Sequence, residues 1–379
     1  MNMDMTRRNL LRGGTGVAVG AAAALALPAQ DAAAEPAVNP ANVPGGTALI
    51  DVAAGSTRWL TGVGNQDSST TLQGIAFDSV NGHLYTLQIA GASQVSYLRS
   101  GSQAAVTASI GANEHDKSGD LCLTRHDLST GAVTGYMYLL GFGHGVSLGV
   151  EPAKSGSPAY IWTEAGTGQT GFGQEFVRFP FADRTVLWTS HPAVQRFGSP
   201  DPAATSMTPS VDVDHDILLI RYAMGSDHWF AAYDLAAAVA TANTGHPLPA
   251  PLARIQQPTL YKYAADGTPT TDKATFQGFT SYGQYVYMLD GDPRSDTTSG
   301  TLTGTDKWAI HTTSFDLNGT QNSPTTGYIA STHSEADAAA NPREPEGMAV
   351  YTGSGAPRLC FGITNNSGSN HQFDLYYKV

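Results

Sequence analysis

Short runs in which apolar and polar residues alternate recur along the chain, and glycine-rich or Asn-Gly turns separate them. Such alternation is typical of half-buried β-strands. The period of an amphipathic helix is scarce. The alanine-rich stretch from Leu235 to Ala242 is the exception, and we expect one short helix on a loop there. The pattern therefore predicts an all-β protein.

One longer motif recurs about five times. It consists of a polar residue, usually a glycine, alternating small and apolar residues, a turn and an aromatic-rich strand. The first position of the motif is occupied, in chain order, by Gln73, His144, Pro209, Gln277 and Glu346, and the copy at Pro209 is weaker than the other four. The intervals are 71, 65, 68 and 69 residues. A steady period of about 68 residues indicates a repeat architecture in which no unit buries its apolar faces alone.

A second motif follows each copy of the first, and four of its five copies end in Asp-Leu. The copies are Arg125–Leu128, Val177–Phe181, Ala232–Leu235, Thr313–Leu317 and Gln372–Leu375. We interpret each as a third strand that closes on a turn. Two motifs with the same count of five predict a five-bladed β-propeller with about 68 residues per blade and one four-stranded sheet in each blade.

The first residues carry an export signal. Thr6-Arg7-Arg8-Asn9-Leu10-Leu11 precedes an uncharged run from Gly13 to Pro28, and Ala32–Ala34 or Ala29 provides the cleavage site. Twin arginines before such a run are typical of the twin-arginine route. A membrane anchor is disfavoured because the run is short and rich in glycine and alanine. We expect a signal at residues 1–34, a linker at 35–47 and one propeller domain at 48–379.

The two ends of the propeller region are expected to close the ring. Ala48-Leu49-Ile50-Asp51-Val52 is a candidate strand that could pair beside Phe373–Val379 in the last blade. Such pairing of the two termini would cover two exposed sheet edges.

The chain is acidic, with a formal net charge of −12 that becomes −13 once residues 1–34 are removed. An acidic surface argues against nucleic acid and anionic membranes as general partners. We expect no cofactor, no metal, no membrane insertion and a monomer. The two cysteines, Cys122 and Cys360, fall in strand-like runs of the first and last repeats. They are either buried free thiols or a disulfide formed after export, and buried thiols are favoured.

The innermost strands of a propeller surround its axis, so the repeated polar position should place Gln73, His144, Gln277 and Glu346 around one axis. Amides and carboxylates bind sugar hydroxyls, and histidine can transfer a proton or bind an anion near neutral pH. This pattern predicts a site for a polyol or a phosphodiester. Alternatively, these side chains only hydrogen-bond one another, and the glycines only permit close strand packing.

Other charged residues offer further candidates. Arg343, Glu344 and Glu346 form the most charged stretch beside the predicted axis, and Arg343 could clamp a carboxylate or phosphate or only pair with Glu344. Glu164 and Glu346 could be the acid–base pair of a glycosidase if they faced one another. Asp212–Asp216 resembles a metal-binding loop but lacks the glycine and the distal glutamate of a calcium loop, so a tight strand turn is the favoured interpretation.

Four segments together resemble a known family. These segments are residues 139–151, Tyr160–Glu164, Phe276–Phe279 and Arg343–Ala349. The family is the propeller family named after teichoic acid biosynthesis protein C, whose domain also occurs in receptor-binding proteins of staphylococcal phages. Exported actinobacterial members are often labelled phage baseplate proteins. The resemblance covers most of residues 48–379. It implies a five-bladed propeller that recognises a wall-associated glycan, and it implies no particular ligand residue.

The sequence differs from those phage proteins in its export signal and in lacking stem or tail-assembly regions, so assembly into a phage particle is not expected.

Three candidate functions follow from the sequence. The first is a secreted protein that binds a cell-wall or extracellular glycopolymer, teichoic acid-like or another polysaccharide, at its axial face through Gln73, His144, Gln277, Arg343, Glu344 and Glu346. The second is a secreted hydrolase, lyase or phosphodiesterase that uses His144 and Glu346 as acid and base. The third is a structural wall protein.

Overall fold

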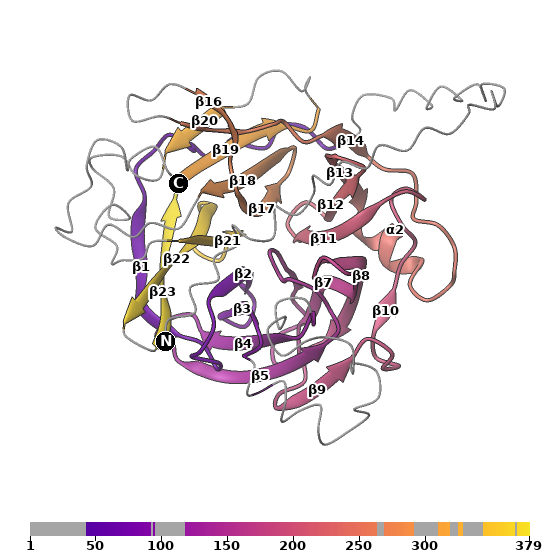
Figure 1. The fold of residues 1–379 in the computed structure, drawn as a ribbon, viewed down its shortest axis with the longest axis horizontal. Helices are drawn as coiled ribbons and strands as arrows, with labels where there is room; N and C mark the ends of the chain where they lie inside the picture. Colours follow the sequence, from indigo (N-terminus) through magenta and orange to yellow (C-terminus); the bar gives the residue numbers. More distant parts are fainter. Residues whose placement is uncertain are drawn as a thin grey trace, which may run out of the picture. The chain divides into compact units, whose positions relative to one another are not determined.

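The computed structural model describes residues 43–91, 94, 118–263, 269–291, 310–318, 325–328, 344–367 and 370–379. The compact unit that contains them begins at Pro40. Five sheets dominate this unit, and each consists mainly of antiparallel neighbours in the chain (Figure 1). The predicted all-β, five-bladed propeller is confirmed.

The first three blades take the strands in chain order from the inside outward. Blade 1 contains β2 (Leu72–Asp78), β3 (His83–Ile89), β4 (Leu121–Asp127) and β5 (Val133–Leu140), with β9 (Thr185–Trp188) added parallel to β5. Blade 2 contains β6 (Gly149–Glu151), β7 (Tyr160–Thr167), β8 (Gly173–Pro180) and β10 (Gln195–Arg196). Blade 3 contains β11 (Thr205–Asp212), β12 (Ile217–Met224), β13 (Asp227–Asp234) and β14 (Ala253–Gln256).

The remaining strands form two blades and one hairpin. Blade 4 contains β17 (Phe276–Tyr282), β18 (Tyr285–Gly291), β19 (Ile310–Asp316) and β20 (Thr325–Tyr328). Blade 5 contains β21 (Pro345–Tyr351), β22 (Arg358–Ser367), β23 (Asn370–Lys378) and β1 (Thr57–Gly64). The hairpin of β15 (Tyr261–Tyr263) and β16 (Pro269–Lys273) lies between blades 3 and 4 in the chain. The innermost strands contact one another in the ring order β2, β6, β11, β17, β21 and back to β2.

Strand β1 closes the ring, because it comes from the start of the propeller and pairs antiparallel with β23 at its end, Thr57 opposite Tyr377. Closure by both termini was expected, but the predicted strand Ala48–Val52 was wrong. Ile50 and Val52 instead pack in the core between blades 4 and 5. The backbone N–H of Ile50 donates to the Tyr287 hydroxyl over 3.0 Å, so this segment anchors to side chains and leaves the sheet edge to β1.

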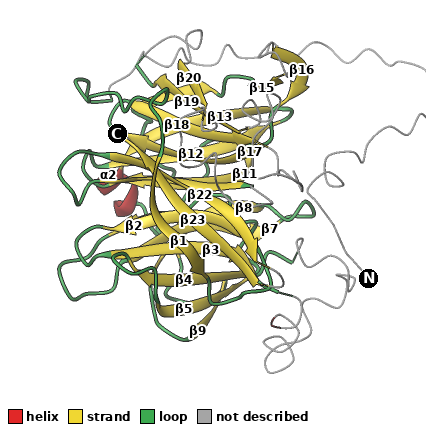
Figure 2. Ribbon diagram, turned by 90° about the vertical axis from the view of Figure 1, so that its left-hand side faces the viewer, coloured by secondary structure: helices red, strands yellow, loops and turns green. Residues whose placement is uncertain are grey.

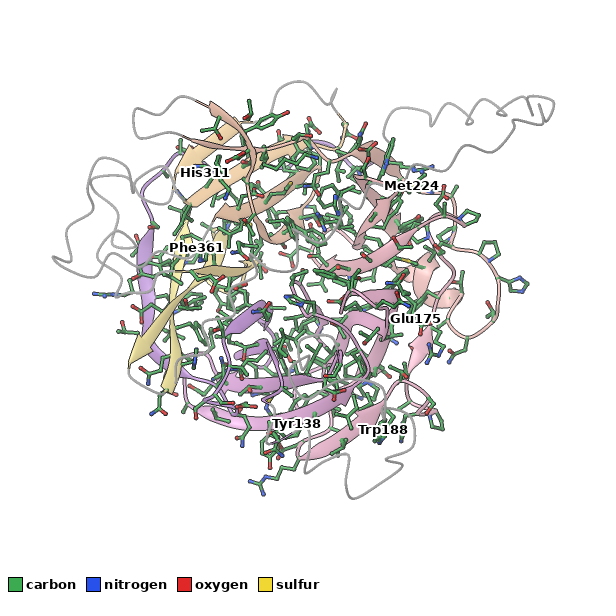
Figure 3. All side chains as sticks on the ribbon, in the orientation of Figure 1. Tyr138, Glu175, Trp188, Met224, His311 and Phe361 are labelled. Atoms are coloured by element: carbon green, nitrogen blue, oxygen red, sulfur yellow. The ribbon has the colours of Figure 1, made fainter. Side chains whose placement is uncertain are left out.

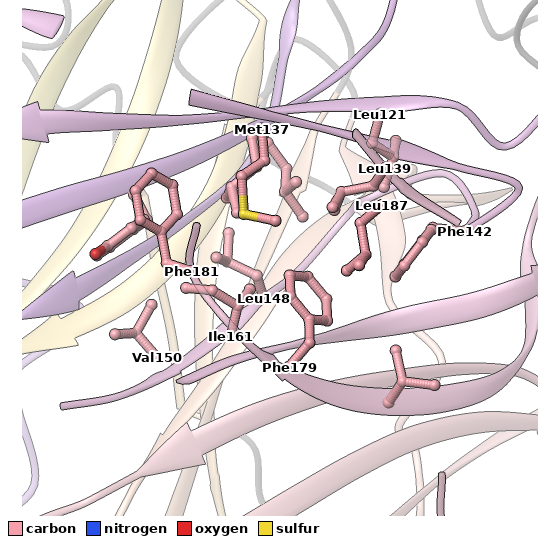
Figure 4. Packing of buried hydrophobic residues seen from close by; sticks show 14 of the residues in the cluster. Leu121, Met137, Leu139, Phe142, Leu148, Val150, Ile161, Phe179, Phe181 and Leu187 are labelled. Carbon is pink, nitrogen blue, oxygen red and sulfur yellow. The ribbon is translucent and has the colours of Figure 1, made fainter. Parts of the chain in front are cut away.

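Five larger hydrophobic clusters of the described residues each lie between two neighbouring blades. The cluster between blades 1 and 2 includes Met137, Phe142, Ile161 and Phe179 (Figure 4). Buried side chains such as Phe361 fill the spaces between the sheets (Figure 3). Because both faces of a blade are covered, middle strands such as β4 and β19 are buried along almost their whole length, polar residues included.

The second motif marks third strands, as expected. β4, β13 and β19 end at the aspartates of their Asp-Leu pairs, whereas β23 continues past Asp374 to Lys378 because its far end pairs with β1. The expected short helix is α2 (Leu235–Ala240), drawn in red in Figure 2. The Asp234 side chain caps it by accepting the N–H of Ala237.

Cys122 and Cys360 are both free and buried, as favoured from the sequence. Burial raises the pKa of the Cys122 thiol to about 12, which keeps it protonated. In the described part of the chain, no helix has the length and hydrophobicity needed to cross a membrane.

Candidate functional site

A β-bulge accompanies the repeated polar residue in three blades. The pairing of β2 with β3 shifts between Leu72 and Gly74, around Gln73. The pairing of β17 with β18 shifts around Gln277, and that of β21 with β22 shifts directly after Glu346. A bulge adds one residue to a strand and re-aims its side chain. The polar-glycine motif is therefore the sequence of a bulge at the start of an innermost strand, and we call this end of the axis the polar end.

Gln73 and Glu346 meet at the polar end, across the boundary between blades 1 and 5. Nε2 of Gln73 lies 3.5 Å from Oε1 of Glu346, and it also donates to the carbonyl of Leu72 over 3.0 Å. Both side chains are buried, with 5 % and 1 % of their surface exposed. The structure thus brings together two of the four residues that were predicted to face the axis.

Gln277 is fully buried at the start of β17. Its Nε2 donates to the carbonyl of Gly291 over 2.9 Å and so joins the start of β17 to the end of β18. This bond satisfies a backbone carbonyl within blade 4, as buried polar groups generally do.

His144 lies in the connection between β5 and β6, and its position depends on Glu164 of β7. Oε1 of Glu164 accepts the backbone N–H groups of His144, over 2.9 Å, and Gly145, over 2.5 Å. Oε2 accepts the N–H of Gly173 over 2.6 Å. The imidazole packs against Phe172 with ring centroids 4.9 Å apart. His144 is thereby fixed, and little of it is exposed.

Glu164 is a positioning residue in this arrangement. Burial raises the pKa of its carboxyl to about 7, against the opposing effect of the three backbone N–H bonds and of Arg221. Because three N–H groups occupy its two oxygens, the geometry gives no support to the predicted acid–base pair of Glu164 and Glu346.

Of the charged stretch Arg343–Glu346, the structure describes Glu344 to Glu346. The backbone of Glu344 makes two hydrogen bonds with Thr364 of β22. The N–H of Glu344 donates to the Thr364 hydroxyl over 3.1 Å, and the carbonyl of Glu344 accepts the N–H of Thr364 over 2.8 Å. Arg343 lies outside the described residues, so its predicted role as an anion clamp stays a prediction.

The Asp212–Asp216 segment forms the tight turn between β11 and β12, as favoured. Oδ1 of Asp212 accepts the N–H groups of Asp214 and His215, and its Oδ2 lies 2.8 Å from Nδ1 of His215. No group of three potential metal ligands occurs among the residues that the structure describes.

The axis is packed next to the polar end. A Cβ on Gly347 would lie 2.8 Å from the Cα of Gly74, and the Ser147 hydroxyl donates to the carbonyl of Phe279 over 3.3 Å, joining blades 2 and 4. A small cavity at the opposite end is lined by residues that include Ser281 and Tyr282. The packed axis therefore separates the polar end from this cavity.

Two charged residues at the polar end escaped the sequence analysis, Arg221 of β12 and Asp290 of β18. Both occupy late positions in second strands, as Glu164 does in β7. Nε of Arg221 donates to Oε1 of Gln257 over 2.7 Å. Its guanidinium carbon lies 3.8 Å from the ring centroid of Phe276, the strand partner of Asp290. A single charge late in an otherwise apolar strand is the signal that could have identified them.

The Asp290 carboxyl makes stability depend on pH. Burial raises its pKa from 3.8 to about 7, and the nearby Arg221 guanidinium opposes this only in part. Between those values the folded state binds more protons than the unfolded state, so stability falls as the pH rises from about 4 to about 7. We expect Asp290→Asn to remove this component, which is at most about 1.4 kcal/mol per pH unit.

Urea unfolding of both proteins from pH 4 to pH 8 measures this difference. If Asp290 instead formed a tight ion pair that lowered its pKa, wild-type stability relative to Asp290→Asn would rise with pH below about 4 and stay level above it. That outcome would contradict the predicted sign.

The propeller region matches a known protein family. The model of the family described as "Phage 5-bladed beta propeller receptor binding platform domain" matches residues 71–377. The chain belongs to this family. The match runs from β2 into β23 and so includes strands of all five blades, while β1 of blade 5 precedes it. A search of the curated proteins found no match.

One solved structure supports the fold. The tail fibre of Staphylococcus aureus phage P68 is similar with a TM-score of 0.57 and 15 % identity, over 85 % of this chain and 52 % of the fibre chain. This chain thus spans about half the length of that fibre. Weaker similarities include Trypanosoma rangeli sialidase (TM-score 0.36, 9 % identity, 86 % of this chain and 60 % of that chain). The N11 neuraminidase-like protein of a bat influenza virus is also weakly similar (TM-score 0.36, 9 % identity, 86 % and 94 %). Similarity at this level carries no argument about activity.

Proposed function

We propose that this propeller binds a cell-wall or extracellular glycopolymer, teichoic acid-like or another polysaccharide, at the polar end of its axis. The observation that carries the proposal is the convergence of Gln73 and Glu346 from two blades. The connection that bears the fixed His144 also reaches β2, because a Cβ on Gly74 would lie 2.7 Å from the carbonyl oxygen of Gly145. Amide, carboxylate and imidazole groups supply both donors and acceptors, which is what a hydroxyl-rich polymer requires.

The strand connections support the polar end as the functional end. There, β3 ends at Ile89 while β4 begins at Leu121, and β18 ends at Gly291 while β19 begins at Ile310. At the opposite end, β17 ends at Tyr282 and β18 already begins at Tyr285, and the longer connection from Asp234 to Ala253 contains the helix α2. Binding residues occur disproportionately on long connections that a rigid scaffold holds in place.

The family supports recognition of a cell surface. Its description names receptor binding, and one similar structure is a phage tail fibre. In this chain the predicted export signal would bring the propeller outside the cell by the twin-arginine route, as a secreted or wall-associated protein. We propose the glycan itself as the partner, with no nucleic acid and no membrane insertion, and a monomer as the binding form.

The test is retention of the mature protein, residues 35–379, on immobilised teichoic acids and on acidic and neutral polysaccharides. The soluble phase is assayed for released fragments at the same time. We expect retention without fragments. His144→Ala or Glu346→Gln should weaken retention roughly tenfold, the effect of one hydrogen bond that involves a charged or buried group. Asp272→Asn, on an exposed strand position, is the control that should change nothing.

Fragments released by the wild type but not by His144→Ala or Glu346→Gln would make the protein a glycan-active enzyme and overturn the binding proposal. Failure of every polymer to retain the protein would leave the third function, a structural wall protein, as the better account.

A further inference from the structure

Arg221 is held rigidly at the polar end by contacts from two directions. Its strand β12 pairs it with Thr208 of β11 and Phe230 of β13. Its Nε donates to Gln257 over 2.7 Å, and its guanidinium carbon stands 3.8 Å from the ring centroid of Phe276 in the next blade. These contacts fix both the position and the orientation of the guanidinium group.

Most of the hydrogen-bonding capacity of this guanidinium is unused. An arginine side chain carries five N–H donors, and only the one on Nε has an acceptor among the residues that the structure describes. The four N–H donors of the two Nη groups have none there. Only 7 % of Arg221 is exposed. The Nη atoms are nevertheless not among the fully buried unpaired atoms of the described residues, so solvent or a ligand can reach these four donors.

The neighbouring carboxylates do not fill that role. Asp290 and Glu164 both act on Arg221 electrostatically, yet neither makes a hydrogen bond to it. The oxygens of Glu164 accept backbone N–H groups, and Oδ2 of Asp290 is buried without a partner among the described residues. Burial lowers the pKa of Arg221 to about 9, which leaves it charged at neutral pH. A charged fork and a carboxyl group with an unpaired oxygen therefore lie near one another.

We propose that Arg221 binds an oxyanion of the polymer, a phosphodiester or a carboxylate, through its two Nη groups, while Asp290 accepts a hydrogen bond from a neighbouring hydroxyl of the same ligand. The planar fork of arginine matches both oxyanions in a bidentate manner. This inference deepens the proposed function, on which it rests, by naming the class of polymer as anionic and hydroxylated. Arg343 is not needed for it.

The polymer experiment compares wild type, Arg221→Gln and Arg221→Lys with the control Arg184→Gln. Arg184 is highly exposed, so its loss removes the same charge away from the site. The probes are a purified polyol-phosphate teichoic acid, polygalacturonate and neutral dextran, and calorimetry measures each Kd. We expect Arg221→Gln to weaken binding of the charged polymers roughly 10- to 100-fold, with a smaller loss for Arg221→Lys. The charged polymer whose Kd rises more in Arg221→Gln identifies the oxyanion.

A second measurement separates this inference from the proposed function. Inorganic phosphate, compared with chloride at equal ionic strength, should raise the Tm of the wild type and not that of Arg221→Gln, because a ligand stabilises only the state that binds it. If phosphate shifts the Tm through Arg221 but no polymer is retained, the proposed function fails and the oxyanion site stands.

Equal phosphate shifts in wild type and Arg221→Gln, or charged polymers that bind both equally, would overturn the oxyanion site. Circular dichroism establishes that the variants are folded. Should Arg221→Gln fail to fold, Arg221→Lys serves as the comparison, because it keeps the charge and loses the bidentate fork.

Discussion

Replacing Gly347 by alanine should lower the free energy of unfolding by about 2–5 kcal/mol. Its φ of 69° lies in the left-handed region, where an L-residue costs about 1–2 kcal/mol. In addition, a Cβ there would lie 2.8 Å from both the Cα of Gly74 and the N of Ile75, which are backbone atoms of the neighbouring innermost strand. Overpacking of this kind costs about 1–3 kcal/mol more, because the ring of innermost strands has to widen.

Gly82 offers a matched control. Its φ is 68°, and a Cβ added there would meet nothing within 4 Å. Gly82→Ala should therefore show only the conformational cost of about 1–2 kcal/mol. Urea unfolding of the two variants separates the two effects. Equal losses of stability in Gly347→Ala and Gly82→Ala would contradict the close approach of blades 1 and 5 at the axis.

Replacing Glu164 by alanine should lower the free energy of unfolding by about 3–5 kcal/mol. The change leaves the buried N–H groups of His144, Gly145 and Gly173 without their acceptor, and each unsatisfied group costs about 1–3 kcal/mol unless water enters. Because the connection that bears His144 then loses its anchor, retention of polymer should fall as well.

Glu164→Gln is the informative intermediate, since it keeps the shape but presents an amide NH2 group to one side of the N–H cluster. We expect its stability to lie between that of wild type and that of Glu164→Ala, and the exposed Asp272→Ala to stay within about 0.5 kcal/mol of wild type. Thermal and urea unfolding provide the measurement. A Glu164→Ala protein as stable as wild type would show that the carboxylate is not what holds the His144 connection.

The sequence was enough to predict the architecture, because each blade repeats the same local demands. The bulge sequence recurs in three blades and the Asp-Leu end in four, at one spacing, so each weak local signal is repeated along the chain. Ring closure was predicted only in part. The apolar residues of Ala48–Val52 resemble a strand, but they serve the core between blades 4 and 5, while Thr57–Gly64 forms the sheet edge.

The site was harder to predict, because its members are brought together by contacts between blades. Gln73 and Glu346 were chosen from their shared repeat position, and they do meet. Arg221 and Asp290 share no motif with them, and their importance depends on hydrogen bonds that are absent, which no spacing in a sequence encodes. Glu164 was considered as an acid–base partner of Glu346 if the two faced one another, and its oxygens instead accept three backbone N–H groups.

The most direct test of the central claim is a crystal structure of the mature protein with a short oligomer of whichever polymer it retains. The account predicts electron density for the oligomer at the polar end, in contact with Glu346 or the Nη groups of Arg221. An oligomer bound instead at the opposite end of the axis, or on the outer strands of a blade, would contradict it.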